Sequence, residues 1–372
     1  MSKFFWGLTG LVRLVVLTVL TAAMLMSCGD PKIGPPVGNR VVYQESVGEG
    51  LNIQDIAVVS ETKAYISCLQ NSGLVIFNPK TGKKVSTIDL SRFNAYAGTD
   101  SAEAYPFANS LAVCGDYLYV ACQRLNSLFE IADTSLIAVI NIRTDAIVAS
   151  INLNKRNPSA MSVFDNMLLV SSSGDWSDVT AASSGIEMID LVRNENLGLI
   201  ADGSAFGGSL TDVIFISRNK AYAAVMTANW TTDIIEFNPQ AKTVGAKISG
   251  ISDGSGGLAY DGSKLYVGDR GFGAAGVAVV NMSANAVEQT VPTEMPPSSL
   301  AIISSGAAVS VAATTIAADY SAANFEIIST GDYSVSRNLL SGLYTDNVVR
   351  AFGGDVYILE RFGKDNVIKI LF

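Results

Sequence analysis

An internal repeat constrains the fold of this chain more than any other feature of its sequence. Each copy holds two short apolar runs, a variable polar loop, a third run that ends in a turn, and a fourth run. The runs are rich in Val, Ile and Tyr, which predicts β-strands. Four strands in each of seven copies, spaced by roughly 50 residues, predict an all-β chain, a seven-bladed β-propeller of four-stranded antiparallel blades. The copies align on their second run, at Tyr65, Tyr119, Leu169, Tyr222, Tyr266, Ser310 and Tyr357.

The two ends of the repeat region predict how the ring closes. The last copy reaches Phe372 after only three strands, whereas a spare strand, RVVYQESV, precedes the first copy at residues 40–47. A propeller must close its ring or leave strand edges exposed. We therefore expect residues 40–47 to pair with residues 366–372 as the outer strand of the last blade, with Val42 in the core. Tandem β-sandwiches, the alternative, do not predict an incomplete last unit.

The N-terminal segment has the pattern of an export signal. Lys3 and Arg13 precede an apolar run, LVVLTVLTAAMLM, that contains no charge. This run is shorter than the roughly 20 residues that span a bilayer. It ends at Leu25-Met26-Ser27-Cys28, which resembles a bacterial lipobox. The resemblance implies cleavage before Cys28 and a lipid on its sulfur; a plain signal peptide or an uncleaved anchor is the alternative.

The predicted organisation therefore has three parts. Residues 1–28 are a lipoprotein signal peptide that ends at the lipidated Cys28, residues 29–39 are a tether, and residues 40–372 are the propeller. The tether is rich in Gly and Pro and has no apolar periodicity, as expected for an extended linker. This arrangement predicts a lipid-anchored protein of the bacterial cell envelope, at the outer membrane, facing either the periplasm or the cell surface.

Composition excludes several classes of function. The chain has no histidine, so it lacks the usual general base, the Ser-His-Asp triad, and histidine ligands for zinc or haem. Without Lys3 and Arg13, 23 basic residues face 34 acidic ones, a net charge of −11. An acidic chain without a basic stripe is repelled by phosphate backbones, so we expect no nucleic-acid partner.

Three cysteines follow Cys28, at Cys68, Cys114 and Cys122. No CxxC spacing occurs, so the pattern indicates neither a redox motif nor a zinc knuckle. Cys68 and Cys122 occupy one register in adjacent blades, so their side chains point the same way round the ring. A disulfide needs Cβ atoms about 4 Å apart, so we expect three free thiols.

Loops on one face of the ring carry the candidate binding residues. This face holds the loops between second and third strands and the connections from blade to blade, and loops on a rigid scaffold often carry function. Both tryptophans beyond residue 28 lie in these loops, and tryptophan is over-represented at binding hot spots. An acid–base pair follows the second strand in two blades. The candidate binding residues are Arg124, Asp175, Trp176, Trp230, Asp269, Arg270, Phe272, Tyr320, Glu360 and Arg361.

Two simpler interpretations of these residues stay open. The aromatic rings could cap the blade ends, and the charged groups could form local salt bridges between neighbouring loops. The long connection at residues 94–109 is a candidate lid. Asp175 and Asp178 are candidate cation ligands, but no calcium-binding pattern accompanies them. The sequence predicts no catalytic residue, no metal site and no cofactor.

One stretch of the second copy resembles a known family. LYVACQ (118–123), followed by AVINIRTDAIVASI (138–151), is similar to the repeat of YVTN-type propellers, which runs roughly YVxN, a loop, and VxVIDxxTxxVVxxI. The resemblance is diffuse over residues 40–372 and implies a fold rather than a chemistry. Members of that family include surface-layer and periplasmic proteins.

These observations favour a non-catalytic, membrane-tethered binding protein that is monomeric as a fold. The expected partner is a small molecule, a glycan or an envelope protein, held on the loop-rich face. One alternative is a propeller enzyme that uses carboxylates and a metal in place of histidine. Another is a structural or assembly protein of the envelope. The sequence does not distinguish among these ligands.

Overall fold

The computed structural model describes residues 40–372, except residues 179, 274 and 306–307. The predicted signal peptide, Cys28 and the tether lie outside the described residues. By its internal contacts the chain divides into two units, residues 1–34 and 35–372, of which the second contains the propeller. No helix in residues 40–372, as far as these are described, is long and apolar enough to cross a membrane.

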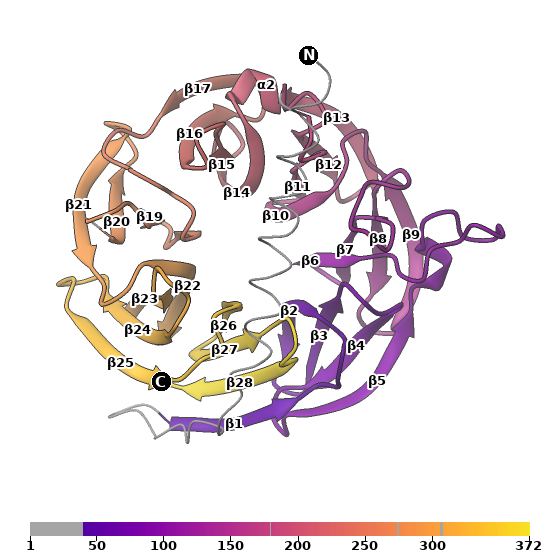
Figure 1. The fold of residues 1–372 in the computed structure, drawn as a ribbon, viewed down its shortest axis with the longest axis horizontal. Helices are drawn as coiled ribbons and strands as arrows, with labels where there is room; N and C mark the ends of the chain where they lie inside the picture. Colours follow the sequence, from indigo (N-terminus) through magenta and orange to yellow (C-terminus); the bar gives the residue numbers. More distant parts are fainter. Residues whose placement is uncertain (1–39, 179, 274, 306–307) are drawn as a thin grey trace, which may run out of the picture. The chain divides into compact units, whose positions relative to one another are not determined.

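The described residues form a seven-bladed β-propeller, as predicted, with seven antiparallel sheets of four strands arranged in a ring (Figure 1). The first, inner strands of the blades are β2 (Ile53–Ser60), β6 (Ala108–Cys114), β10 (Pro158–Phe164), β14 (Ser209–Ser217), β18 (Leu258–Tyr260), β22 (Pro297–Ser305) and β26 (Asn347–Phe352). The second strands are β3 (Lys63–Cys68), β7 (Tyr117–Cys122), β11 (Met167–Ser172), β15 (Lys220–Met226), β19 (Leu265–Asp269), β23 (Ala308–Ile316) and β27 (Asp355–Glu360).

The remaining strands complete the blades outward. The third strands are β4 (Gly73–Asn78), β8 (Leu136–Asn141), β12 (Gly185–Asp190), β16 (Thr232–Asn238), β20 (Gly276–Asn281), β24 (Ala323–Ser329) and β28 (Asn366–Leu371). The fourth, outer strands are β5 (Lys83–Asp89), β9 (Ala146–Asn152), β13 (Glu195–Asp202), β17 (Thr243–Lys247), β21 (Ala286–Pro292), β25 (Val335–Ser341) and β1 (Arg40–Ser46). Two single turns of helix, η1 (Ser91–Phe93) and α2 (Gly203–Phe206), lie in connections between blades.

The N-terminal strand closes the last blade, as predicted. β1 pairs antiparallel with β28, with Arg40 opposite Leu371 and Ser46 opposite Asn366, so the sheet order is β1-β28-β27-β26. The expectation that Val42 is a core residue is wrong, because Val42 is 38% exposed. A bulge shifts the register between Val41 and Tyr43. It is Tyr43 that packs inward, with its ring 6.1 Å from that of Phe77 in the first blade.

The hydrophobic core lies between neighbouring blades. One cluster joins Leu74 of the first blade to Leu118 of the second, and another joins Phe77 of the first blade to Leu359 of the last. Second and third strands are covered on both faces, which explains why their sequences are nearly all apolar. The outer strands alternate or are mostly exposed. Each blade is therefore held by its neighbours as well as by its own sheet.

Asparagine or aspartate shapes the turns on the face opposite the binding loops, which we call the turn face. In five blades the last residue of the third strand accepts hydrogen bonds from backbone N–H groups two or three residues later. Such side-chain turns mimic a backbone turn, which explains the NPKTG and NIRTDA motifs. The five residues are Asn78, Asn141, Asp190, Asn238 and Asn281.

The structure corrects the repeat alignment in the sixth blade, where Ser310 was expected to match Leu169. In the third blade, buried Glu187 pairs across the sheet with Val170 and accepts the Asn154 backbone N–H. In the sixth, buried Glu326 pairs with Ala313 and accepts the corresponding N–H of Glu294. Ala312 therefore matches Leu169, because β22 and β23 extend further at their shared turn.

Cys68, Cys114 and Cys122 are free thiols, as predicted. Cys68 and Cys122 are buried in two different clusters between blades, and Cys114 is half-buried. Burial raises the pKa of both buried thiols to about 12, so they are protonated at neutral pH. They behave as small core residues.

Candidate functional site

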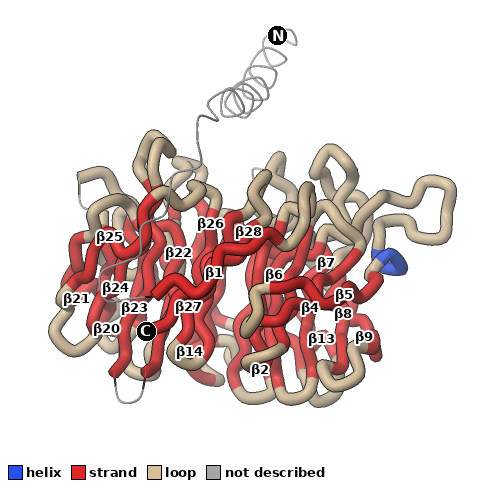
Figure 2. Tube along the Cα trace, turned by 90° about the horizontal axis from the view of Figure 1, so that it is seen from below, coloured by secondary structure: helices blue, strands red, loops and turns tan. Residues whose placement is uncertain are grey.

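The loops between second and third strands project from one edge of the ring, whereas the turns at the opposite edge are short (Figure 2). Six of these seven loops present an exposed aromatic side chain, one in every blade from the second to the seventh. We call these six residues the aromatic rim. They are Phe129, Trp176, Trp230, Phe272, Tyr320 and Phe362.

Three members of the aromatic rim share one backbone geometry. Phe129, Trp230 and Tyr320 have φ values of 61°, 62° and 57°, in the left-handed region that bulky residues rarely adopt. In each case the backbone N–H donates to the carbonyl three residues earlier, at 2.9–3.0 Å. The same tight turn thus recurs in the second, fourth and sixth blades. Each turn ends in an exposed ring, and Trp230 is 78% exposed.

The predicted candidates Trp176, Trp230, Phe272 and Tyr320 are therefore all available to a partner. Phe129 and Phe362 also belong to the rim, although they were not among the predicted candidates. Both lie in loops between second and third strands, which the repeat locates in the sequence. An aromatic residue in such a loop is the sequence feature that could have identified them. The structure adds which of these rings are exposed.

Several predicted charged candidates are used within the protein. Asp269 and Glu360 are buried. Asp269 accepts the backbone N–H groups of Ser252, Asp253 and Gly271, each at 2.9 Å. Glu360 accepts the Tyr344 N–H at 2.8 Å and two side-chain amides. Both carboxylates are hydrogen-bonded within the protein and hold loops in place.

The predicted arginines also make internal bonds. Arg124 pairs with Asp133 at 2.5 Å and donates to the Thr134 carbonyl at 2.8 Å. Arg270 donates to the Pro297 carbonyl at 2.9 Å. Arg361 forms an ion pair with Asp346 and donates to Gln54 Oε1 at 3.4 Å. Only Arg361 among these arginines lines the axial cavity described below.

The candidate lid at residues 94–109 is bonded to the loops beside it. Asn94 donates to the carbonyls of Glu103 and Ala104 at 3.0 and 3.1 Å. The Tyr96 hydroxyl donates to the Ala132 carbonyl, in the loop of the second blade. In this structure the segment is hydrogen-bonded to the loop of the second blade through Tyr96.

The candidate cation ligands Asp175 and Asp178 are satisfied within their own loop. Asp175 accepts the Ser177 backbone N–H at 2.8 Å, and Asp178 accepts bonds from Thr180 and Ser183. These bonds hold the pKa of Asp178 well below its usual range. Among the described residues, no group of three or more cysteine, aspartate or glutamate side chains is arranged to hold a metal ion.

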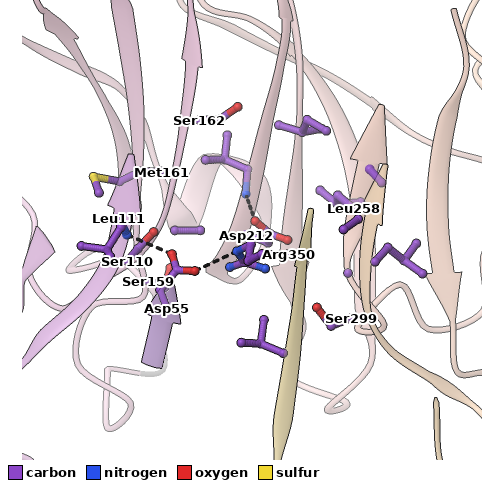
Figure 3. Close-up of a pocket in the computed structure, with 18 of the residues that line it drawn as sticks. Asp55, Ser110, Leu111, Ser159, Met161, Ser162, Asp212, Leu258, Ser299 and Arg350 are labelled. Atoms are coloured by element: carbon purple, nitrogen blue, oxygen red, sulfur yellow. Dashed lines mark hydrogen bonds and ion pairs between the residues drawn. The ribbon is translucent and has the colours of Figure 1, made fainter. Parts of the chain in front are cut away.

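An open cavity of about 420 Å³ lies on the axis of the ring and is lined mainly by the inner strands (Figure 3). Its lining includes three charged groups on inner strands, Asp55 of β2, Asp212 of β14 and Arg350 of β26, with serines and small apolar residues between them. The candidate residues predicted from the sequence do not include these three. Each lies singly in an apolar run, and only the ring brings the three blades to one axis.

Asp55 and Arg350 form an ion pair across the first and last blades. Arg350 Nε donates to Asp55 Oδ1 at 2.8 Å, while Asp55 also accepts the backbone N–H groups of Ile56 and Leu111. Asp55 is buried, whereas the Arg350 side chain keeps 40% exposure, so part of its guanidinium faces the cavity. A buried carboxylate is stable when it is paired and hydrogen-bonded in this way.

Asp212 occupies the position in the fourth blade that corresponds to Asp55 in the first. It accepts the backbone N–H groups of Val213 and Leu258, as Asp55 accepts those of Ile56 and Leu111. Asp212 forms no ion pair within the part of the chain that the structure describes. Its removal from bulk water at the cavity wall raises its pKa to about 6, with the Asp55 charge adding to the increase and the Arg350 charge opposing it.

Comparisons with known proteins identify the fold and no family. No family model and no curated protein sequence matches the chain. Among solved structures, the RRP9 WD40 repeats match with a TM-score of 0.62 and 12% identity, over 91% of this chain and 99% of that one. The resemblance to YVTN-type propellers therefore stays a prediction.

Two further structures show the range of proteins that share this fold. A chain of the mitotic checkpoint complex matches with a TM-score of 0.62 and 12% identity, over 93% of this chain and 97% of that one. Virginiamycin B lyase from Staphylococcus aureus matches with a TM-score of 0.61 and 12% identity, over 90% of this chain and 99% of that one. At this identity the likeness shows the fold alone, since propellers host unrelated functions.

Proposed function

We propose that this chain is a lipid-anchored protein of the bacterial envelope that binds a protein partner on its aromatic rim and performs no catalysis. The observation that carries the proposal is one exposed aromatic residue in each of six adjacent blades. Exposed aromatic residues on rigid loops supply contact area at low entropic cost and dominate binding energy at interfaces. One propeller among the structural neighbours is a chain of the mitotic checkpoint complex, and a protein partner agrees with that example.

The position of the N-terminal strand supports an orientation for the rim. Arg40 pairs with Leu371, at the end of β28 far from the rim loops, so the chain enters β1 at the turn face. From Cys28 to Arg40 a fully extended tether reaches about 43 Å at most. An anchor attached at that end favours a turn face near the membrane and an aromatic rim that faces away from it. A rim in that orientation is accessible to a partner.

Site-specific photo-crosslinking in intact cells of the native host tests the rim. We expect a photoreactive amino acid at Trp230 or Tyr320 to give a discrete cross-linked protein band. The same amino acid at Lys80, on the turn face, should give none. Alanine at Trp176 should weaken cross-linking from position 230 at least tenfold, because truncation of a hot-spot aromatic residue costs about 2 kcal/mol. Bands only from Lys80 would place the interface on the opposite face.

The anchor has a separate test. Cys28→Ser should leave an unprocessed or soluble protein, whereas the wild-type chain should fractionate with membranes and carry the added mass of a lipid. Ser27→Ala keeps a small residue before the cysteine and serves as the control. An unchanged mass and unchanged partitioning of Cys28→Ser would show that the N-terminus is not a lipoprotein signal.

A further inference from the structure

Because the blades repeat, equivalent positions around the axial cavity can be compared from one blade to another. Asp55 and Asp212 hold the same position in the first and fourth blades, two residues before the inner-strand partners of Tyr65 and Tyr222. Both carboxylates accept one backbone N–H from the next residue and one from the following blade. The two carboxylates therefore accept equivalent backbone hydrogen bonds, and their environments differ in the neighbouring side chains.

The blade before each aspartate supplies a different residue at the matching position. Arg350, which pairs with Tyr357 across the last blade, precedes Asp55. Ser162, which pairs with Leu169 across the third blade, precedes Asp212. Since Leu169 and Tyr357 are equivalent in the repeat, Ser162 stands where Arg350 stands. Its short hydroxyl accepts the Phe215 backbone N–H at 2.9 Å and brings no charge to Asp212.

From this difference we infer that the axial cavity binds a small ligand with a cationic N–H donor, a guanidinium or a primary ammonium, and that this cation pairs with Asp212. The ligand would do for Asp212 what Arg350 does for Asp55. Figure 3 shows that Asp212 and Ser162 both line the cavity, and Arg350 extends toward Asp55. The inference goes beyond the proposed function, because it concerns the axis and not the aromatic rim.

The physical chemistry of the cavity agrees with this ligand class. Desolvation raises the pKa of a carboxylate, and the half-buried Asp212 has a raised pKa although the Arg350 charge partly opposes the increase. Charge-assisted N–H···O bonds are stronger than neutral ones, so a cation gains more here than a neutral donor. The cavity volume of about 420 Å³ lies within the range of small-molecule sites. Ala160, Leu258 and Ala301 provide apolar lining for the body of the ligand.

A matched pair of probes tests the charge requirement. n-Butylguanidinium and n-butylurea have nearly the same shape and differ in charge, and their binding can be measured by calorimetry at pH 7.5. We expect n-butylguanidinium to bind residues 40–372 at least tenfold more tightly than n-butylurea. Equal binding of the two probes, or no binding of n-butylguanidinium, would overturn the inference and leave Asp212 as a purely structural acceptor.

Two variants and one control identify the carboxylate. Asp212→Asn keeps the shape and should remove the tenfold preference for the cation, whereas Asp100→Asn, in an exposed connection, should retain it. Ser162→Arg should supply an internal guanidinium as Arg350 does, and should abolish n-butylguanidinium binding while raising the melting temperature. If Ser162→Arg fails to fold, the Asp212→Asn result decides alone. A preference that survives in Asp212→Asn would contradict the assignment. Because none of these variants touches the aromatic rim, their failure leaves the proposed function intact.

Discussion

At the scale of single residues, carboxylates withdrawn from water connect the blades. Glu187 accepts the backbone N–H groups of Asn154 and Lys155, and Asp269 holds the connection at Ser252 and Asp253. These acids lie at the ends or middle of strands, where water cannot satisfy the N–H groups that they bind. A charged acceptor is suited to this task because it accepts several strong hydrogen bonds at once. Asp212 also accepts a backbone N–H from the next blade, but it is only half-buried, and Arg350 forms its ion pair with Asp55 and not with Asp212.

The raised pKa of Asp212 predicts that the stability of the protein depends on pH. Its pKa is about 6 in the folded protein against an ordinary value of 3.8, so the folded state binds the proton more tightly than the unfolded chain does. The stabilisation from the protonated form is complete below about pH 4 and is lost as the pH rises through about 6. An asparagine cannot ionise, so the Asp212→Asn variant does not lose this stabilisation as the pH rises. We expect the stability of Asp212→Asn relative to wild type to increase by about 1–3 kcal/mol between pH 4.5 and pH 7.5.

The measurement is urea unfolding of residues 40–372 at several pH values, compared between each variant and wild type. Asp100→Asn controls for surface charge, because Asp100 is exposed. Its stability relative to wild type should not vary with pH. A flat difference curve for Asp212→Asn as well would show that Asp212 titrates as an ordinary aspartate.

At the scale of elements, β1 shows how one strand serves two blades. It completes the sheet of the last blade by pairing with β28, and its Tyr43 contacts Phe77 and donates to the Pro79 carbonyl of the first blade at 3.0 Å. Val47, just after the strand, is buried and donates its backbone N–H to the Asp365 carbonyl at 2.8 Å. The seam where the chain closes thus has both sheet hydrogen bonds and interblade packing.

Two substitutions in β1 separate these contributions. Tyr43→Ala should lower the free energy of unfolding by about 2–4 kcal/mol, because it removes an aromatic contact and a hydrogen bond between blades. Val42→Ala, on the exposed side of the same strand, should cost less than about 1 kcal/mol. Chemical denaturation of the two variants measures both values. Equal losses would mean that the packing of Tyr43 contributes nothing beyond strand pairing.

At the scale of the whole molecule, the ring makes the starting point of the chain arbitrary. Blades pack against their neighbours through apolar clusters between the sheets, and the last blade meets the first in the same way. Because Arg40 pairs with Leu371, the two ends of the propeller lie side by side at the turn face. We therefore expect the stability of the fold to depend on closing the ring and not on where the chain begins.

A circular permutant tests this property. Joining Phe372 to Arg40 through Asn-Gly, a favoured hairpin turn, and opening the chain between Asp100 and Ser101 should give a folded protein. We expect a melting temperature within about 5 °C of that of residues 40–372, since a small change in stability moves the midpoint of a large domain by only a few degrees. Deleting residues 40–46 without the join should instead expose the β28 edge and cause aggregation or loss of a cooperative transition. An aggregating permutant beside a stable deletion variant would contradict closure by β1.

The sequence alone determined the architecture, because each blade repeats a local pattern of strands and turns that needs no partner to be recognised. The spacing of the second strands, the missing strand at Phe372 and the spare strand at residues 40–47 sufficed to predict seven blades and their closure. The aromatic loops were also predictable, since they interrupt that pattern. The inward side of β1 was not, because a single alternating strand has two possible inward faces, and the structure turns Val41, Tyr43 and Glu45 inward rather than Val42. The sequence also did not predict the shift of alignment in the sixth blade. It did not predict the roles of Asp269 and Glu360 either, because these depend on backbone groups from other connections. The charged groups of the axial cavity come from blades that are far apart in the chain. Only the closed ring brings them together, and only there does the contrast between Arg350 and Ser162 appear.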